Sequence, residues 1–101
     1  MGMTTIRIVR YTTTPDTVAE NTRLVSQVFA ALDDAKPDGF RYGTLLLPEE
    51  NTFLHLVITP GEENPLPGLA AFDEFQRDLN SRVVGPPRPA AATLVGNFRL
   101  L

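Results

Sequence analysis

The chain contains a single histidine, His55, which lies in the middle of the apolar stretch TFLHLVIT. The unperturbed pKa of a histidine is near 6.5, so its side chain can act as a general base at neutral pH. The hydroxyl of Tyr42, in the preceding apolar stretch, can donate a hydrogen bond to a substrate oxygen. We take these two residues as the candidate catalytic groups. The alternatives are a neutral histidine hydrogen-bonded at a subunit interface and a half-buried strand tyrosine.

Four other polar side chains are candidates for orienting a substrate or stabilising its anion. Three come from predicted strands and one from the first predicted helix. Each has an ordinary alternative: an arginine can extend to solvent at a strand edge, a tyrosine can be a strand aromatic, and an asparagine can lie on a solvated helix edge. The four candidates are Arg10, Tyr11, Arg41 and Asn21.

The acidic residues avoid the predicted strands. All 12 aspartates and glutamates fall in predicted helices or loops, whereas the strands contain arginines, tyrosines and the histidine. A cavity beside the sheet is therefore expected to be electropositive and to suit a phenolate, enolate or carboxylate. Gly43, within a predicted strand, indicates a bulge or a close approach by a ligand. The net charge of −3 argues against nucleic acid as a partner.

Composition excludes several kinds of site. The chain has 101 residues and no cysteine, which removes disulfides, thiolate nucleophiles and zinc fingers. One histidine cannot build a multi-histidine metal site, so we expect no metal. No apolar run approaches the ~20 residues of a membrane span, and no signal-peptide pattern is present. We expect a single cytoplasmic domain over residues 1–101 that has no membrane partner. Residues 1–3 are expected to be disordered or to be extra residues that precede the natural start.

The hydrophobic pattern predicts the order βαββαβ. This order is typical of the ferredoxin-like fold, an α+β class with a four-stranded antiparallel sheet. In this topology we expect the first and third strands to be central neighbours that run parallel. The stretches IRIV and LHLV resemble each other, which would place Arg7 level with His55. Strands are predicted at 4–13, 40–47, 52–59 and 91–101, and helices at 14–36 and from Pro65 to the stop at Gly85.

Both faces of the predicted sheet carry apolar side chains. In the third strand Leu54 and Leu56 point one way, while Phe53 and His55 point the other. Two helices can cover only one face of the sheet. We therefore expect a homodimer with two sheets packed face to face, His55 on the face away from the helices and Arg10 on the helix side. The alternative is a monomer with a partly apolar exposed face.

The stretches GFRYGTLLL, TFLHLVIT and NPLPGLAAFDEFQ resemble small proteins of the antibiotic biosynthesis monooxygenase type, many of them actinobacterial, in the dimeric α+β barrel superfamily. The resemblance covers about residues 4–100. It implies an oxygenase that needs no cofactor and oxidises small phenolic or polyketide-like aromatics with molecular oxygen. Haem-degrading members use a tryptophan, which this chain lacks, so haem degradation is not expected.

The alternative function is a non-enzymatic module of the same fold that binds a small ligand or only oligomerises. A closed pocket of ~300 Å³ or more beside Tyr42 or His55 would favour a ligand site. A fully packed layer between sheet and helices would favour a module without one.

Overall fold

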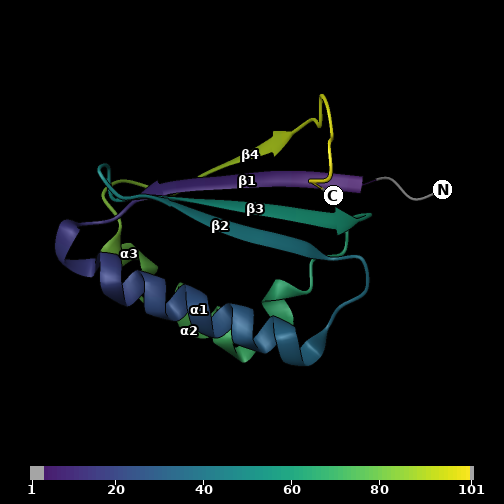
Figure 1. Cartoon of the computed structure of the whole chain (residues 1–101). Coiled ribbons are helices and arrows are strands. Elements are labelled where there is room, and N and C mark those ends of the chain that lie inside the picture. Colours follow the sequence, from purple (N-terminus) through teal and green to yellow (C-terminus); the bar gives the residue numbers. More distant parts are fainter. Residues whose placement is uncertain (1–3, 101) are drawn as a thin grey trace.

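One layer of helices lies against a four-stranded antiparallel sheet in the computed structural model, which describes residues 4–100 (Figure 1). The strands lie side by side in the order β2-β3-β1-β4. The predicted α+β, ferredoxin-like class is confirmed, while the expectation for residues 1–3 lies outside the described residues. The strands are β1 (Thr4–Thr12), β2 (Arg41–Leu47), β3 (Thr52–Pro60) and β4 (Arg88–Ala92), and the helices are α1 (Val18–Ala35), α2 (Ala70–Arg77) and α3 (Leu79–Arg82), with 3-10 turns η1 (Pro15–Thr17) and η2 (Leu66–Gly68).

Helix α1 confirms the first predicted helix, with a change in its buried face. Pro15 opens the preceding turn, and the helix ends where Lys36 adopts a left-handed φ of 45° and donates its backbone N–H to the Leu32 carbonyl. Thr22, placed in the predicted apolar stripe, is exposed, whereas Asn21 is fully buried. A polar residue therefore occupies a core position of this helix.

No helix within residues 4–100 is long and apolar enough to span a membrane.

The second predicted helix is divided into three short pieces. The Asn64 side chain accepts a hydrogen bond from the backbone N–H of Leu66 at 3.0 Å, which opens η2. Asp78, with a φ of −115°, separates α2 from α3. The division keeps Phe75 and Leu79 buried under the sheet and turns Arg82 into the interior as well.

The central strands β1 and β3 run antiparallel, so the expected parallel pairing was wrong. Val9, not Arg7, lies opposite His55. The helical crossover makes β1 and β2 parallel, and a short hairpin joins β2 to β3. Because β3 lies between β1 and β2, it must run against both.

The face of the sheet that meets the helices is also the opposite of the one expected. His55 packs at 5.7 Å, centroid to centroid, from the ring of Phe75 in α2. Tyr11 and Phe53 belong to the same buried cluster. Arg10 is exposed on the other face, 3.9 Å from Glu50. Aromatic side chains are prominent in the core between sheet and helices, whereas the opposite face holds mostly aliphatic ones.

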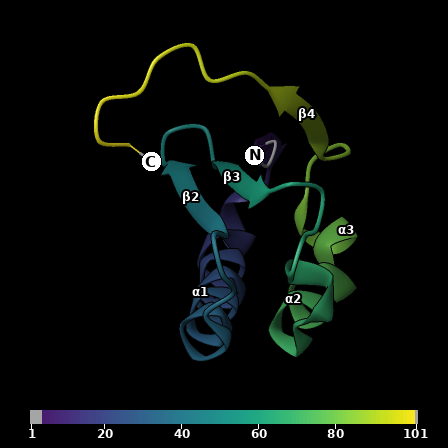
Figure 2. The same ribbon diagram turned by 90° about the vertical axis from the view of Figure 1, so that its right-hand side faces the viewer.

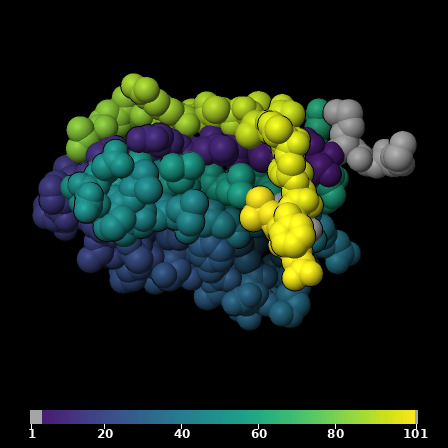
Figure 3. All heavy atoms as spheres, turned by 45° about the horizontal axis from the view of Figure 1, so that its top comes forward, coloured from purple at the N-terminus to yellow at the C-terminus, as the bar shows by residue number. Residues whose placement is uncertain are grey.

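The last strand is earlier and shorter than predicted. β4 starts at Arg88, directly after the prolines, and reaches Ile6 near the start of β1 by Ala92. Little of β1 then remains to pair with, so residues 93–100 leave the sheet. They run along the side of the sheet opposite the helices, from β4 toward β2 (Figure 2). Figure 3 shows that this segment crosses the sheet near one end and leaves the β2–β3 hairpin uncovered.

Candidate active site

His55 is held between two tyrosines from the neighbouring strands. Its Nε2 lies 2.7 Å from the hydroxyl of Tyr11 in β1, and its Nδ1 lies 2.6 Å from the hydroxyl of Tyr42 in β2. The Thr44 hydroxyl is a further partner of Nδ1, at 3.0 Å. Both ring nitrogens are thus engaged by groups that the sheet itself positions.

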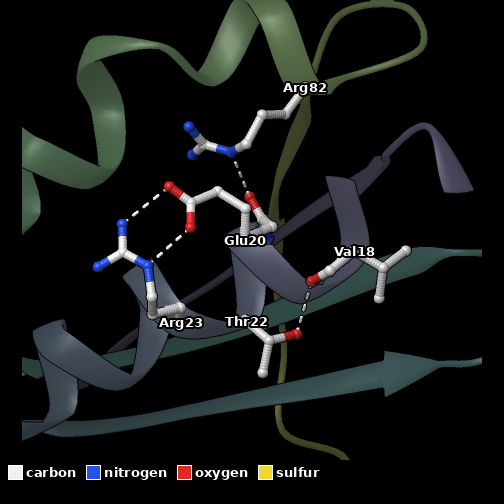
Figure 4. A network of polar contacts seen from close by, with 6 residues as sticks. Val18, Glu20, Thr22, Arg23 and Arg82 are labelled. Carbon is white, nitrogen blue, oxygen red and sulfur yellow. Dashed lines mark hydrogen bonds and ion pairs between the residues drawn. The ribbon is translucent and has the colours of Figure 1, made fainter. Parts of the chain in front are cut away.

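The polar contacts continue from Tyr11 into the helical layer. Asn21 Nδ2 donates to the Tyr11 hydroxyl at 2.9 Å, and Arg82 Nε donates to Asn21 Oδ1 at 3.0 Å. The Arg82 guanidinium also donates to the Phe75 carbonyl at 2.7 Å. Figure 4 shows Arg82 reaching from the neighbouring helical segment toward α1, beside the exposed Glu20–Arg23 pair. We call the series Arg82, Asn21, Tyr11, His55 and Tyr42 the polar chain.

Two backbone hydrogen bonds fix the position of the chain at Arg82 relative to the end of β1. The N–H of Thr14 donates to the Arg82 carbonyl at 2.9 Å, and the Val84 N–H donates to the Thr12 carbonyl at 2.7 Å. Among the described residues the Arg82 side chain has no carboxylate within ion-pair distance, although it is only 4% exposed. Its charge is balanced by carbonyl oxygens and by the face of the Phe75 ring, 5.4 Å away.

Burial keeps the central groups of the polar chain neutral at neutral pH. It lowers the pKa of His55 from 6.5 to about 4, because the imidazolium would lose its hydration. Burial also raises the pKa of Tyr11 and of Tyr42 above the ordinary value for tyrosine. His55 is therefore a far weaker base in the folded chain than its type alone indicates.

The polar chain ends at the wall of a pocket between sheet and helices. The pocket has a volume of about 230 Å³, and none of the described residues that line it is acidic. This is below the ~300 Å³ at which pockets for drug-sized ligands begin, so it fits a compact molecule. Its aromatic walls are Tyr11, Tyr42, Phe72 and Phe75, with His55 among them.

A larger hollow of about 500 Å³ lies elsewhere, between residues 37–40 and 60–65. It is open to solvent, and prolines and acidic side chains make up most of its lining. None of the six candidate residues lines it. The smaller pocket is the better candidate site because buried, hydrogen-bonded polar groups converge there.

The structure brings four of the six candidate residues together. Tyr42, His55 and Tyr11 line the pocket, and Asn21 lies directly behind Tyr11. Arg10 and Arg41 are exposed and do not line it, so a role for them in binding stays a prediction. Gly43 is neither a bulge nor crowded: it pairs regularly with Leu56, and a Cβ there would meet nothing within 4 Å.

Three residues at the pocket or the polar chain were not identified as site candidates from the sequence. Arg7 is exposed and lines the pocket, Thr44 contacts His55, and Arg82 anchors the polar chain. A signal existed for Arg82, which follows Phe75 by seven residues and Leu79 by three and so continues the apolar stripe. Within residues 4–100, no group of three or more carboxylate and imidazole side chains is arranged to hold a metal ion.

Comparison with known proteins agrees with this fold. No protein-family profile matches the sequence, and no curated protein matches it. Among solved structures, a Nitrosomonas europaea protein provisionally named an antibiotic biosynthesis monooxygenase has a TM-score of 0.75 at 10% identity, covering 94% of this chain and 93% of its own. A Caulobacter crescentus protein with the same provisional name has a TM-score of 0.70 at 14% identity, covering 94% and 92%.

A third similar structure is SnoaB from Streptomyces nogalater, a cofactor-independent oxygenase solved as a mutant. Its TM-score is 0.67 at 15% identity, and the match covers 95% of this chain and 97% of SnoaB. The chain has the fold of the antibiotic biosynthesis monooxygenase-like proteins. At these identities the likeness establishes the fold, and the chemistry must be argued from the site.

Proposed function

We propose that the protein is a cofactor-independent monooxygenase that oxidises a compact aromatic or polyketide-like molecule with molecular oxygen. The observation that carries the proposal is the environment of His55, which lies between two tyrosine hydroxyls in the wall of an aromatic pocket without acidic lining. Such a pocket favours a planar substrate that becomes an anion. The cofactor-independent oxygenase among the similar folds supports the same class.

The reaction would convert a methylene group next to an aromatic ring into a carbonyl. In balanced form it is R₂CH₂ + O₂ → R₂CO + H₂O, with one oxygen atom retained and the other leaving as water. His55 is the proposed base: a substrate proton passes to a tyrosine oxygen while the hydrogen of that tyrosine moves to the imidazole. The resulting carbanion, or its enolate, then supplies the electrons that reduce oxygen.

The low pKa of His55 is compatible with this role only when the substrate is bound. An anion beside the imidazole favours its charged form and raises its pKa again. The second tyrosine hydroxyl can stabilise the enolate oxygen by donating a hydrogen bond. Tyr42 and Tyr11 are thus the residues that we propose to contact the substrate together with His55.

The alternative is a binding module without catalysis. The observation that favours it is that both nitrogens of His55 already have hydrogen-bond partners and that its pKa is about 4. A pocket of this kind can hold a small aromatic ligand with no proton transfer at all. The pocket volume of about 230 Å³ is below the ~300 Å³ expected of a ligand site, which argues for a module that only oligomerises.

We also propose that the protein is a homodimer through the sheet face opposite the helices. Ile8 and Leu56, level with each other on this face, are only partly buried, and the nearby Leu45 is 65% exposed. Four more exposed apolar side chains lie on the segment that crosses this side: Leu94, Val95, Phe98 and Leu100. An apolar patch of this extent suits a second copy packed about a two-fold axis.

The test of the catalytic proposal is oxygen uptake with anthrone as the probe substrate. We expect uptake by the unmodified protein and a loss of at least about tenfold in His55→Ala, since general-base catalysis contributes at least this much. Phe53→Leu is the matched control because Phe53 is equally buried in β3 but does not line the pocket. Equal rates in His55→Ala and the unmodified protein would remove His55 from the mechanism, and binding without uptake would favour the module.

A further inference from the structure

The direction of the hydrogen bonds in the polar chain is fixed at its Arg82 end. A guanidinium can only donate, so the side chain of Asn21 must present its oxygen to Arg82. Its amide nitrogen then faces the Tyr11 hydroxyl, 2.9 Å away, and donates to it. Arg82 thereby settles the orientation of an amide that could otherwise be turned either way.

The donor and acceptor roles of Tyr11 and His55 follow from the orientation of Asn21. The Tyr11 oxygen accepts from Asn21, which leaves its one hydrogen for Nε2 of His55 at 2.7 Å. If Nε2 carried the hydrogen instead, the buried Tyr11 hydrogen would have no acceptor among these partners, at a cost of about 1–3 kcal/mol. A neutral imidazole has one hydrogen, which must then be on Nδ1.

The hydrogen on Nδ1 points at the end of the polar chain in β2. Two hydroxyl oxygens lie within reach of Nδ1, those of Tyr42 at 2.6 Å and Thr44 at 3.0 Å. With Nδ1 as the donor, neither hydroxyl needs to give its hydrogen to His55. The Thr44 hydroxyl is also a side-chain hydrogen-bond partner of Tyr42, to which it can donate its own hydrogen. Thr44 does not line the pocket and Tyr42 does, so the Tyr42 hydrogen is the one that a ligand can receive.

We propose that Arg82 and Asn21 act as positioning residues that hold His55 in its Nδ1–H tautomer, so that the Tyr42 hydroxyl donates a hydrogen bond to an acceptor oxygen of the ligand. This deepens the proposed function by naming the ligand chemistry: a compact aromatic with a carbonyl, phenolate or enolate oxygen. A ligand that can only donate hydrogen bonds would find no matching partner in Tyr42. The two positioning residues lie outside the pocket lining and act only through Tyr11.

The tautomer can be measured directly because His55 is the only histidine in the chain. Nitrogen-15 NMR at pH 7 distinguishes a ring nitrogen that carries hydrogen from one that does not. We expect hydrogen on Nδ1 in the unmodified protein. A spectrum with hydrogen on Nε2 would overturn the proposal without reference to any ligand or reaction.

Asn21→Asp tests the direction. A carboxylate can only accept, so it would pair with Arg82 and take the hydrogen of Tyr11, which reverses the polar chain and moves the imidazole hydrogen to Nε2. Asn80→Asp is the control, because it adds the same charge at an exposed site of α3. Retention of the original pattern in Asn21→Asp, or a doubly protonated ring, would overturn the proposal.

The ligand chemistry is tested with 1,4-naphthoquinone, whose oxygens can only accept hydrogen bonds. Calorimetry should show that Asn21→Asp binds it at least about tenfold more weakly than the unmodified protein, and that Asn80→Asp does not. Equal binding by all three proteins, or binding by none, would overturn the ligand assignment. If tautomer and binding are as expected but anthrone causes no oxygen uptake, the proposed oxygenase activity fails while this inference stands.

Discussion

Tyr11 and His55 are diagonal neighbours on the helix-facing side of adjacent antiparallel strands, and this relationship brings their hydroxyl and Nε2 to 2.7 Å. Tyr11 lies opposite Phe53, and His55 lies opposite Val9. Long side chains reach such diagonal partners easily. The contact is therefore built into the sheet, and the helices add only its continuation to Asn21 and Arg82.

Tyr11→Phe should destabilise the fold more than Tyr42→Phe. Loss of the Tyr11 hydroxyl leaves a buried amide hydrogen of Asn21 and Nε2 of His55 without partners, at a cost of about 2–3 kcal/mol. Tyr42→Phe should cost about 1 kcal/mol, because Thr44 remains as a partner of Nδ1. Urea unfolding at pH 7 measures both. Equal losses would show that the hydrogen bonds behind Tyr11 contribute little.

Lowering the pH should reduce the free energy of unfolding because of His55. The pKa of this histidine is 6.5 when unfolded and about 4 when folded, so below pH 6.5 the unfolded chain binds a proton that the folded chain does not. Stability is then full above pH 6.5 and falls toward pH 4. Between pH 7 and 5.5 the loss should be about 1 kcal/mol. Urea unfolding of His55→Gln should show no such change in this range, and an equal slope would place its cause elsewhere.

Light scattering should give twice the mass of one chain at micromolar concentration. Leu56→Glu, which places a charge in the centre of the sheet face opposite the helices, should yield the mass of a single chain. Ala30→Glu, on the exposed side of α1, should leave the mass unchanged. A single-chain mass for the unmodified protein would contradict the proposed dimer.

Arg7 should contribute to the affinity for anionic ligands. It lines the pocket from an exposed position, so its charge can attract a phenolate or carboxylate but is screened by salt. Arg7→Gln should weaken the binding of 1-hydroxy-2-naphthoate by about threefold at low salt, which corresponds to under 1 kcal/mol. Arg41→Gln, also exposed but outside the pocket lining, is the control. An effect of equal size in both variants would assign it to the general charge of the protein.

The sequence predicted the order of the elements and named as site candidates three residues that line the pocket, but it assigned the wrong face to β3. Leu54 and Leu56 alternate with Phe53 and Val57, so apolar side chains occur on both faces of the strand. Alternation then shows which residues share a face without showing which face meets the helices. In the structure, the face of β3 with Phe53 and His55 meets the helices, where the His55 ring packs against Phe75.

The end of the chain and the anchor of the site were harder to predict for different reasons. Residues 91–101 have the composition of a strand, but where β4 starts is set by the prolines before Arg88 and by the finite length of β1. Arg82 is a charged residue at a position that continues an apolar stripe. One of its hydrogen-bond acceptors, the Asn21 side chain, is far from it in sequence, and the other, the Phe75 carbonyl, belongs to the backbone. Pattern alone cannot supply such partners.

The walls of the pocket differ in how freely they can evolve. Tyr11, Tyr42 and His55 are interlocked by hydrogen bonds, so replacing one of them disturbs the others. Leu66 and Phe72, on the helical side, contribute only apolar surface to the lining. Descendants of this sequence could therefore exchange one aromatic guest for another by resizing those two side chains, while the hydrogen-bonded strand side is inherited intact.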